Sequence, residues 1–459
     1  MTGASPGQGR PGAKPAGTGL LIEGAAAIAT MAGGLRRGPA QTDAAEIRGD
    51  APGGSAVAVW DGRIVAAGPQ PEVIRAIEAA GHSPEEFARL DAAGGLVTPG
   101  LIDAHTHLVF AGTRESEWQM RARGAGYLQI LESGGGILST VAATRRASDE
   151  DLLAGARGRL VEMLANGTTT AEAKSGYGLD VATELRQLGV IGRLDSEGPI
   201  QLVPTYLGAH AVPAEFRDQA AGVPVVATGT ATDRYVAHVI REQLPAVARQ
   251  GVARFCDVFC EEGVFSADQS RLILRAAVDL GLRLRVHADE LQPSGGAELA
   301  AELGCVSADH LAAPSDGGVA ALARAAKSGS PVVATLLPAT SWFLGAHHFA
   351  PARRFIDAGI PVALATDLNP GTSPTLSLTL VMSIACLEMG LTPSEALAAV
   401  TINAAHALGL GAEIGSIEPG KQADMVIWAV PTVEQLPYWL GARPARVVIK
   451  RGRVVLERG

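Results

Sequence analysis

Two histidines one residue apart, His105 and His107, follow a short apolar run within Asp-Ala-His-Thr-His. In an extended chain, side chains two positions apart point to the same side, so both imidazoles can face one point. Neutral imidazole is the most common metal ligand among protein side chains. The spacing therefore indicates part of a metal site, although two hydrogen-bonded histidines in a turn would leave the same pattern.

Three more groups with ligand chemistry, His287, His310 and Asp367, each end or directly follow another apolar run, up to 262 positions beyond His105. If these runs are parallel strands, their carboxyl ends meet at one edge. Three imidazoles and one carboxylate suit one Zn²⁺ or iron (Fe³⁺) ion per chain, with a position left for water. The predicted metal ligands are His105, His107, His287 and Asp367.

The remaining acid–base groups suggest hydrolysis. A bound divalent cation lowers the pKa of its water to about 7, which supplies hydroxide against a poorly reactive amide carbonyl. Glu290 follows His287 by three positions, where it can reach the substrate and pass a proton to the leaving nitrogen, or alternatively serve as an acidic residue at a helix start. His310 can be a ligand, a base or a hydrogen-bond partner of a ligand, and we favour a base or electrophilic role. The predicted catalytic residues are Glu290, His310 and Asp367.

The elements that must position these residues form a regular pattern between residues 97 and 408. Apolar, β-rich runs alternate with longer segments of helical periodicity, which is typical of parallel strands joined by helices. Eight such strands predict a (β/α)₈ barrel of the TIM type, whose chemistry lies at the carboxyl ends of the strands. The predicted strands span residues 100–105, 168–173, 201–207, 254–260, 283–287, 307–310, 331–336 and 361–366.

The two ends of the chain predict a second, smaller unit. Residues 56–60 and 63–67 flank Asp61-Gly62 as a hairpin, and residues 424–429 and 446–456 form further β-like runs, with a turn at Arg451-Gly452. We expect residues 19–96 and 409–459 to form one small β-sandwich domain beside the barrel domain of 97–408. Residues 1–18, rich in Gly, Pro and Ala, are expected to be a disordered tail. Residues 111–146 are expected to be a loop or short helices over the barrel mouth.

The composition of the chain limits the kinds of molecule that it is expected to bind. A net charge of -9 disfavours nucleic acid and anionic membranes, and no apolar run is long enough for a membrane span. Four sparse cysteines without CxxC spacing indicate reduced thiols, as in a cytoplasmic protein. The fourth predicted strand ends in Cys-Glu-Glu and lacks the lysine that, when carboxylated, bridges two metals in some metal-dependent hydrolases. Lys174 ends the second strand instead, which favours a single metal.

Several longer motifs together resemble the imidazolonepropionase family of metal-dependent amidohydrolases across the whole barrel, and the similarity continues into both flanking segments. They are Phe-Ala-Gly-Thr-Arg-Glu-Ser-Glu (110–117), Gly-Tyr-Leu-Gln-Ile-Leu-Glu-Ser-Gly-Gly-Gly-Ile (126–137), Lys-Ser-Gly-Tyr-Gly-Leu (174–179), Leu-Gly-Ala-His (207–210), His-Ala-Asp-Glu (287–290) and Asp-Leu-Asn-Pro-Gly-Thr-Ser (367–373). The resemblance implies hydrolysis of 4-imidazolone-5-propanoate to N-formimino-L-glutamate in histidine degradation, and a homodimer. Trp118 departs from the family pattern, in which we expect Phe.

The resemblance also implies which residues hold the substrate. Arg114 is expected to grip the propanoate carboxylate, because guanidinium binds carboxylates in bidentate fashion. The other expected substrate contacts, besides Glu290, are Tyr177, His210, Asn369, Gly371 and Thr372. Arg114 can instead form only a surface salt bridge, Tyr177 can be packing alone, and His210 can be a structural histidine.

Three rival functions can be compared with this reading. A cytosine or guanine deaminase uses the same histidine and aspartate frame but has no need of Arg114. A dihydroorotase or hydantoinase is disfavoured by the missing lysine. A barrel that binds ligands without catalysis is compatible with the fold, but it has no need of both the metal ligands and Glu290.

Overall fold

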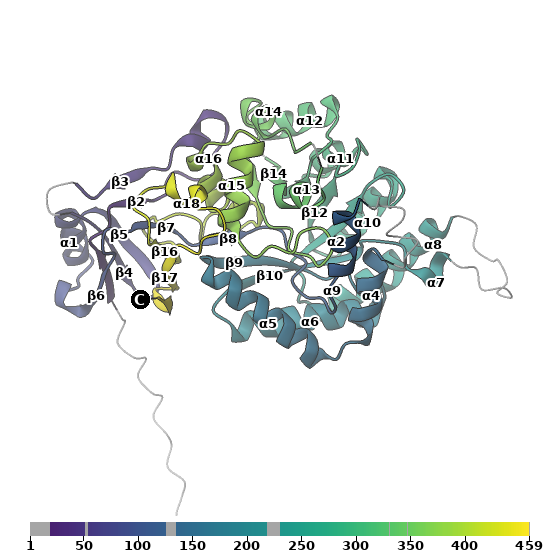
Figure 1. Ribbon diagram of the computed structural model, residues 1–459, viewed down its shortest axis with the longest axis horizontal. Coiled ribbons are helices and arrows are strands. Elements are labelled where there is room, and N and C mark those ends of the chain that lie inside the picture. The colour runs from purple at the N-terminus through teal and green to yellow at the C-terminus, as the bar shows by residue number, and fades with distance from the viewer. Residues whose placement is uncertain are drawn as a thin grey trace, which may run out of the picture.

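The computed structural model describes residues 19–50, 54–124, 135–217, 230–329, 331–346 and 348–458. The expected tail of 1–18 and part of the expected mouth loop of 111–146 lie outside these ranges. In Figure 1 a large α/β unit occupies the centre and right, and sheets made from the chain ends lie on the left.

The centre of the molecule is an eight-stranded, wholly parallel sheet in which each strand pairs with its neighbour in the sequence. Each strand overlaps one of the eight predicted strands, so the predicted (β/α)₈ barrel is confirmed. Almost every strand residue is buried, because helices cover the outer face and side chains fill the interior. The strands are β8 (Leu101–Asp103), β9 (Thr168–Lys174), β10 (Gln201–Ala209), β11 (Phe255–Cys260), β12 (Arg283–Ala288), β13 (Ser307–His310), β14 (Val333–Leu336) and β15 (Val362–Leu364).

The first and last strands of this sheet, β8 and β15, meet through residues of the predicted site. The backbone N–H of Asp367 donates to the carbonyl of His105 at 3.0 Å. The Asp103 carboxylate accepts the backbone N–H of Thr366 at 3.0 Å and its hydroxyl at 2.6 Å. Burial raises the pKa of Asp103 to about 7, although the Thr366 hydrogen bonds oppose the shift. Closure of the barrel and placement of two predicted ligands therefore depend on the same contacts.

Helices begin where short polar side chains can cap them. Ser148 and Ser266 each accept the N–H three residues ahead and form capping boxes, while Asp180 and Ser315 cap their helices in the same way. The helices of the barrel are α5 (Asp149–Ala165), α6 (Val181–Glu197), α7 (Ala214–Arg217), α8 (Ala231–His238), η3 (Val239–Gln243), α9 (Leu244–Gln250), α10 (Ala267–Asp279), α11 (Gly296–Leu303), α12 (Asp316–Lys327), α13 (Pro338–Phe343), α14 (Ala352–Asp357), α15 (Leu378–Glu388), α16 (Pro393–Ala399) and α17 (Ile402–Ala407). The others are η1 (Gly38–Thr42), α1 (Gln70–Ala79), η2 (Pro84–Glu86), α2 (Glu115–Ala122), α4 (Ile137–Arg146) and α18 (Gln435–Tyr438).

The chain ends form two further sheets. A four-stranded sheet has the order β5-β4-β1-β6, with β1 (Gly19–Glu23), β4 (Ser55–Trp60), β5 (Arg63–Pro69) and β6 (Phe87–Asp91). Its β4–β5 pair is the predicted hairpin. A six-stranded sheet has the order β18-β17-β16-β7-β2-β3, with β2 (Ala27–Ala29), β3 (Glu46–Arg48), β7 (Leu96–Pro99), β16 (Met425–Trp428), β17 (Ala445–Lys450) and β18 (Arg453–Glu457). Antiparallel pairing of β16 with β7 joins the two ends of the chain.

The two sheets share one apolar core, as in a sandwich. Ile22 and Val57 of the first sheet lie in the same buried cluster as Val97 and Ile427 of the second. On the other side of the six-stranded sheet, Trp428 is fully buried against the barrel. The predicted domain limits stay a prediction, and β7 pairs with the six-stranded sheet. Among the described residues, no helix is long and apolar enough to cross a membrane.

Candidate metal centre

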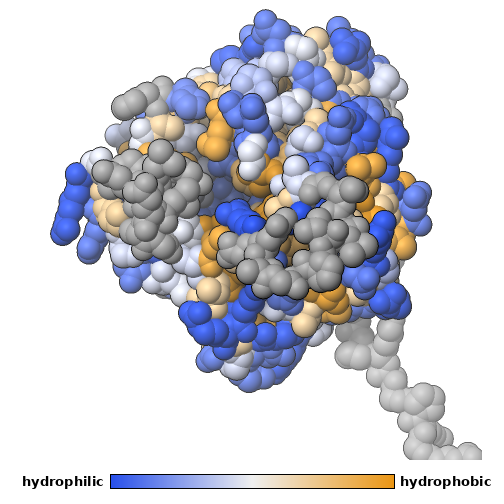
Figure 2. All heavy atoms as spheres, turned by 90° about the vertical axis from the view of Figure 1, so that its right-hand side faces the viewer, coloured by the Kyte–Doolittle hydropathy of each residue, from blue (hydrophilic) through white to orange (hydrophobic). Residues whose placement is uncertain are grey.

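The predicted site lies at the carboxyl ends of the barrel strands. Helices α2 and α7, which follow β8 and β10, lie on the right of Figure 1, so the strand ends face that side. Figure 2 views this face and shows a hollow between hydrophilic and hydrophobic side chains. Five of the predicted metal-site and acid–base residues lie at these strand ends, and each is at least 94% buried. They are His105, His107, His287, His310 and Asp367.

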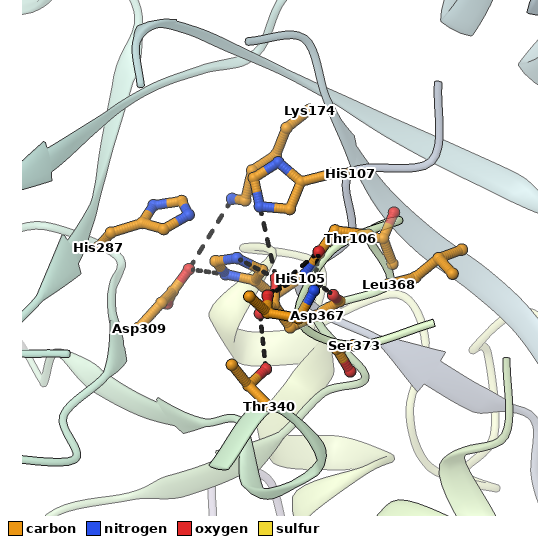
Figure 3. A network of polar contacts seen from close by, with 12 residues as sticks. His105, Thr106, His107, Lys174, His287, Asp309, Thr340, Asp367, Leu368 and Ser373 are labelled. Atoms are coloured by element: carbon orange, nitrogen blue, oxygen red, sulfur yellow. Dashed lines mark hydrogen bonds and ion pairs between the residues drawn. The ribbon is translucent and has the colours of Figure 1, made fainter. Parts of the chain in front are cut away.

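Their ligand atoms form two overlapping groups. Atoms of His105, His107 and Asp367 lie within 4.8 Å of one another, and so do atoms of His105, His287 and His310. The Asp367 Oδ1 atom lies 3.5 Å from His105 Nε2 and 3.4 Å from His107 Nε2. Figure 3 shows His105 and His107 beside Asp367, with His287 on the other side of His105. The structure therefore brings together residues that are remote in the chain.

These residues fit a metal ion on two grounds. The Nε2 atoms of His105 and His287 are buried and have no hydrogen-bond partner among the described residues. An unsatisfied buried polar atom costs roughly 1–3 kcal/mol, which a bound cation would offset. Burial, followed by neighbouring positive charge, lowers the pKa of His105 and His107 well below the usual range. Neutral imidazole is the form that ligates metals, and the set of nitrogen and carboxylate donors suits zinc or iron.

Carboxylates that the sequence analysis did not single out lie directly behind two of the histidines. Asp309 hydrogen-bonds to His105 Nδ1 at 2.7 Å, and an Asp257 oxygen lies 3.0 Å from His287 Nδ1. The signal in the sequence is an acidic residue inside an otherwise apolar strand, since burial of a charge requires a partner. Thr340 was also missed, and its hydroxyl donates to Asp367 Oδ2 at 2.7 Å.

Glu290 and His310 face one another beside this cluster. The Glu290 Oε2 atom lies 3.5 Å from His310 Nε2, and the two residues line a pocket together with Thr340 and Ser341. Burial raises the pKa of Glu290 to about 8, and the negative charge of Asp367 adds to the shift. Burial also lowers the pKa of His310 to about 3. A neutral imidazole and a carboxyl group that titrates near neutrality are suited to proton transfer.

Two residues of the predicted site have strained backbones. His310 has a φ of 74° and Asp367 a φ of 52°, in the left-handed region that residues other than glycine seldom occupy. Such conformations cost about 1–3 kcal/mol each and persist only where the surrounding structure enforces them. Both strained residues belong to the predicted catalytic set.

Arg114 lies just before α2 and is not a surface residue. Its side chain is 11% exposed, and its Nε and Nη2 atoms donate to the two carboxylate oxygens of Glu117 at 2.8 and 2.7 Å. A Cβ at Gly371 would lie 1.9 Å from Arg114 Nη1, so only glycine leaves room for the guanidinium there. The structure thus brings Arg114 and Gly371 together. Trp118, on the same helix, is half exposed.

Tyr177 and His210 border His107. The rings of His107 and His210 stack with centroids 4.8 Å apart and planes at 14°, and the Tyr177 ring lies 5.7 Å from His107. The His210 Nδ1 atom hydrogen-bonds to the carbonyl of Gly176 at 3.0 Å. Both side chains are buried, and burial raises the pKa of Tyr177, which keeps its hydroxyl protonated.

The loop after β15 is held by Asn369. Its Oδ1 atom accepts the N–H groups of Gly371 and Thr372 at 2.9 and 2.7 Å, and its Nδ2 donates to the carbonyl of Asp367 at 2.8 Å. The Asn369 side chain therefore shapes the loop that follows the predicted ligand Asp367.

Comparison with known proteins agrees with this geometry. A model of the "Amidohydrolase family" matches residues 96–455. The imidazolonepropionase of Geobacillus kaustophilus is 51% identical over 403 residues, which cover 87% of this chain and 90% of the relative. That of Symbiobacterium thermophilum is 48% identical over 441 residues, covering 96% and 98%.

Solved structures of more distant proteins share the fold. The guanine deaminase of E. coli superposes with a TM-score of 0.67 at 16% identity, covering 96% of this chain and all of the other. An atrazine chlorohydrolase of Arthrobacter aurescens, complexed with zinc and atraton, has a TM-score of 0.68 at 19% identity, and the match covers 95% of both chains. From the family model and the closely similar relatives, the chain belongs to the amidohydrolase family and, within it, to the imidazolonepropionases.

Proposed function

We propose that this chain hydrolyses 4-imidazolone-5-propanoate to N-formimino-L-glutamate, a ring-opening step of histidine degradation. Two imidazolonepropionases are identical to this chain at about half of the aligned positions, over most of its length. The observation that carries the proposal is the convergence of His105, His107, His287 and Asp367 at the barrel mouth, with Glu290 beside them.

The proposed metal site holds one Zn²⁺ or iron ion through His105, His107, His287 and Asp367. A bound cation would supply Lewis-acid chemistry there, polarising the ring carbonyl and making water acidic enough to react near neutral pH. His310 stays outside this set, because its Nε2 atom faces the Glu290 carboxylate at 3.5 Å and serves better as a base or as a donor to the carbonyl oxygen.

Glu290 is the proposed proton carrier. Its carboxylate takes a proton from the attacking water and returns it to the ring nitrogen that leaves, so one group serves as base and then as acid. The pKa of about 8 supports this role, since burial brings the group close to neutrality, where it can accept and release a proton in turn.

Arg114 is the proposed anchor of the propanoate carboxylate. Glu117 occupies two of its donor atoms, and Nη1 points at Gly371 on the loop after β15. Arg121 donates to the carbonyl of Gly371 at 2.9 Å, so two guanidinium groups face one buried carboxylate and leave a net positive charge. We propose that Tyr177, His210, Asn369, Gly371 and Thr372 complete the substrate site.

The contacts of Lys174 support a site with one metal ion instead of two. Its ammonium donates to Glu172 and Asp257, both at 2.7 Å, and is fully buried. A lysine held in this way is not free to become the carboxylated bridge between two metals.

The proposed setting is a cytoplasmic homodimer that acts on a small molecule, without nucleic acid or membrane partners. The net charge of -9 supports the absence of polyanionic partners. The four cysteines form no disulfide, and three of them are buried, which suits a reducing compartment.

An ultraviolet assay of imidazolone propanoate, with and without a chelator, tests the function. We expect the substrate absorbance to fall with formation of N-formimino-L-glutamate, and the chelator to stop the reaction. Ammonia release from cytosine or guanine without ring opening would identify a deaminase instead.

A further inference from the structure

Five of the charged side chains that are fully buried among the barrel strands pair with one another next to the predicted metal ligands. Glu172, Asp257 and Asp309 are carboxylates, and Lys174 and Arg285 are cations. Lys174 pairs with Glu172 and Asp257, while Arg285 pairs with Asp309 at 2.9 Å. None of the five belongs to the proposed catalytic set. We refer to them as the buried charge network.

The buried charge network contacts two of the predicted ligands through their Nδ1 atoms. Asp309 Oδ2 lies 2.7 Å from His105 Nδ1, and Asp257 Oδ2 lies 3.0 Å from His287 Nδ1. In Figure 3, dashed lines join Asp309 to both Lys174 and His105. A carboxylate accepts but does not donate, so the hydrogen bond to Asp309 requires His105 to carry its proton on Nδ1, and the Asp257 carboxylate 3.0 Å from His287 Nδ1 favours the same tautomer there. The Nε2 atoms, which have no partner among the described residues, are then left with free lone pairs.

We infer that Asp257 and Asp309 are positioning residues for the metal ligands His287 and His105. Each fixes the tautomer and the ring orientation in which Nε2 presents its lone pair to the cation. The inference rests on the metal site of the proposed function.

The two buried cations keep these carboxylates charged and in place. Lys174 and the backbone N–H of His287 both donate to Asp257, at 2.7 and 3.2 Å. Arg285 donates to Asp309, and the same guanidinium donates to the carbonyls of Ala104 at 2.7 Å and Ala407 at 2.9 Å. The carbonyl of Ala104 directly precedes His105, so Arg285 orients both the side chain and the backbone of this ligand.

Glu172 extends the network to the middle residue of the His-Thr-His segment. Its Oε2 atom accepts the N–H of Thr106 at 3.0 Å, while its Oε1 accepts from Lys174. The three carboxylates of the network exceed its two cations by one negative charge, and the Asp103 carboxyl is also buried at these strand ends. That charge favours a divalent cation, because interactions between buried charges are weakly screened.

Fold stability alone does not account for these charges. Burying ions costs several kcal/mol each, and apolar side chains of the same volume are often as stable or more so. His107 provides a contrast within the site, because it is oriented by ring stacking on His210 and has no such carboxylate among the described residues. Among the three predicted histidine ligands, only His105 and His287 have a described carboxylate next to Nδ1.

Zinc affinity of the full-length protein tests the inference. Metal-free wild type, Asp309→Asn and Asp257→Asn are titrated with Zn²⁺ in competition with a chromophoric chelator, and the thermal midpoint of each metal-free protein is recorded. An asparagine amide can donate to Nδ1 and so stabilise the wrong tautomer. We expect each variant to bind zinc about 10–100-fold more weakly than the wild type.

Asp424→Asn is the matched control. Asp424 is also buried and pairs with Lys450 at 2.7 Å. Lys450 lies 3.3 Å from Thr170 in the first half of β9, at the end of the barrel away from the predicted site. This variant is expected to lose stability but to keep wild-type zinc affinity. Wild-type affinity in either site variant, or an equal loss in Asp424→Asn, would overturn the inference.

Arg285→Lys provides a second test if an asparagine variant does not fold. It keeps the charge and loses the forked contacts to Asp309 and the two carbonyls, so zinc binding should weaken, and unchanged binding would contradict the inference. Failure of the proposed function has a different signature, because the wild type would then bind zinc without opening the imidazolone ring.

Discussion

At the scale of single residues, burial sets the charge of the groups that do chemistry. His105 and His107 are kept neutral, and Glu290 is brought to a pKa of about 8, in each case mainly by loss of hydration. The sequence alone predicted these residues, because histidine pairs and strand-end acids have recognisable spacing. It did not predict Asp257 and Asp309, since their role depends on neighbours that only the folded barrel supplies.

Glu290→Gln removes the proposed proton carrier while preserving its shape. We expect kcat for ring opening to fall by about 100-fold or more, with zinc content unchanged, because Glu290 is not a ligand in the proposed site. Steady-state kinetics and elemental analysis measure the two effects. Glu262→Gln, at an exposed neighbouring position, is the control and should remain active. Loss of zinc from the Glu290 variant would assign it to the metal instead.

The same substitution changes the pH dependence of stability in the metal-free protein. The pKa of Glu290 is about 8 in the folded chain, above the ordinary 4.5, because of burial. Its stabilising contribution is therefore complete below pH 4.5 and is lost as the pH rises through about 8. Glu290→Gln should gain stability over wild type across this interval, by up to about 5 kcal/mol. Denaturant unfolding at several pH values measures the difference, and a constant difference would refute the shift.

At the scale of elements, strand ends decide where the chemistry lies. All eight barrel strands could be predicted, because strands buried on both faces leave apolar runs that alternate with helices. The contact between α2 and the loop after β15 could not, since Arg114 and Gly371 are joined by packing and not by any local pattern. The Arg114–Glu117 pair also explains why Arg114 is buried and held in one orientation.

Arg114→Ala tests the anchor at the start of α2. If the guanidinium holds the propanoate in both ground and transition states, KM should rise by about 10–100-fold while kcat changes little. Glu117→Gln should raise KM less, because it loosens Arg114 without removing it. Arg123→Ala, an exposed arginine just after the same helix, is the control. A large loss of kcat at unchanged KM would contradict the anchoring role.

At the scale of the whole molecule, both chain ends support the barrel from the side opposite the mouth (Figure 1). The hairpin and the C-terminal strands could be predicted from alternation and turn residues. The order of the six-stranded sheet could not, because pairing of β16 with β7 joins segments more than 320 positions apart and leaves no local signal. Trp428 joins this sheet to the barrel, since its ring packs on Gly167, just before β9. Its Nε1 donates to Thr98 of β7 in the same sheet at 2.9 Å, which fixes the orientation of the ring.

Gly167→Ala tests this junction. Gly167 has a φ of 92°, and a Cβ there would lie 2.6 Å from the Trp428 ring. Strain and overpacking should together lower the free energy of unfolding by about 2–4 kcal/mol, without direct effect on zinc affinity. Gly158→Ala is the matched control: it lies in α5 with open space around it and should be neutral or stabilising by up to about 1 kcal/mol. Equal unfolding free energies for the two variants would contradict the proposed packing.

The central claim is that His105, His107, His287 and Asp367 hold one cation that the reaction requires. Its most direct test is zinc titration of the metal-free protein, with bound zinc and ring-opening rate measured on the same samples. The account predicts that activity rises linearly and stops at about one zinc per chain, and that His287→Ala neither binds zinc with comparable affinity nor opens the ring. Full activity of the metal-free protein, or unchanged zinc binding in His287→Ala, would contradict it.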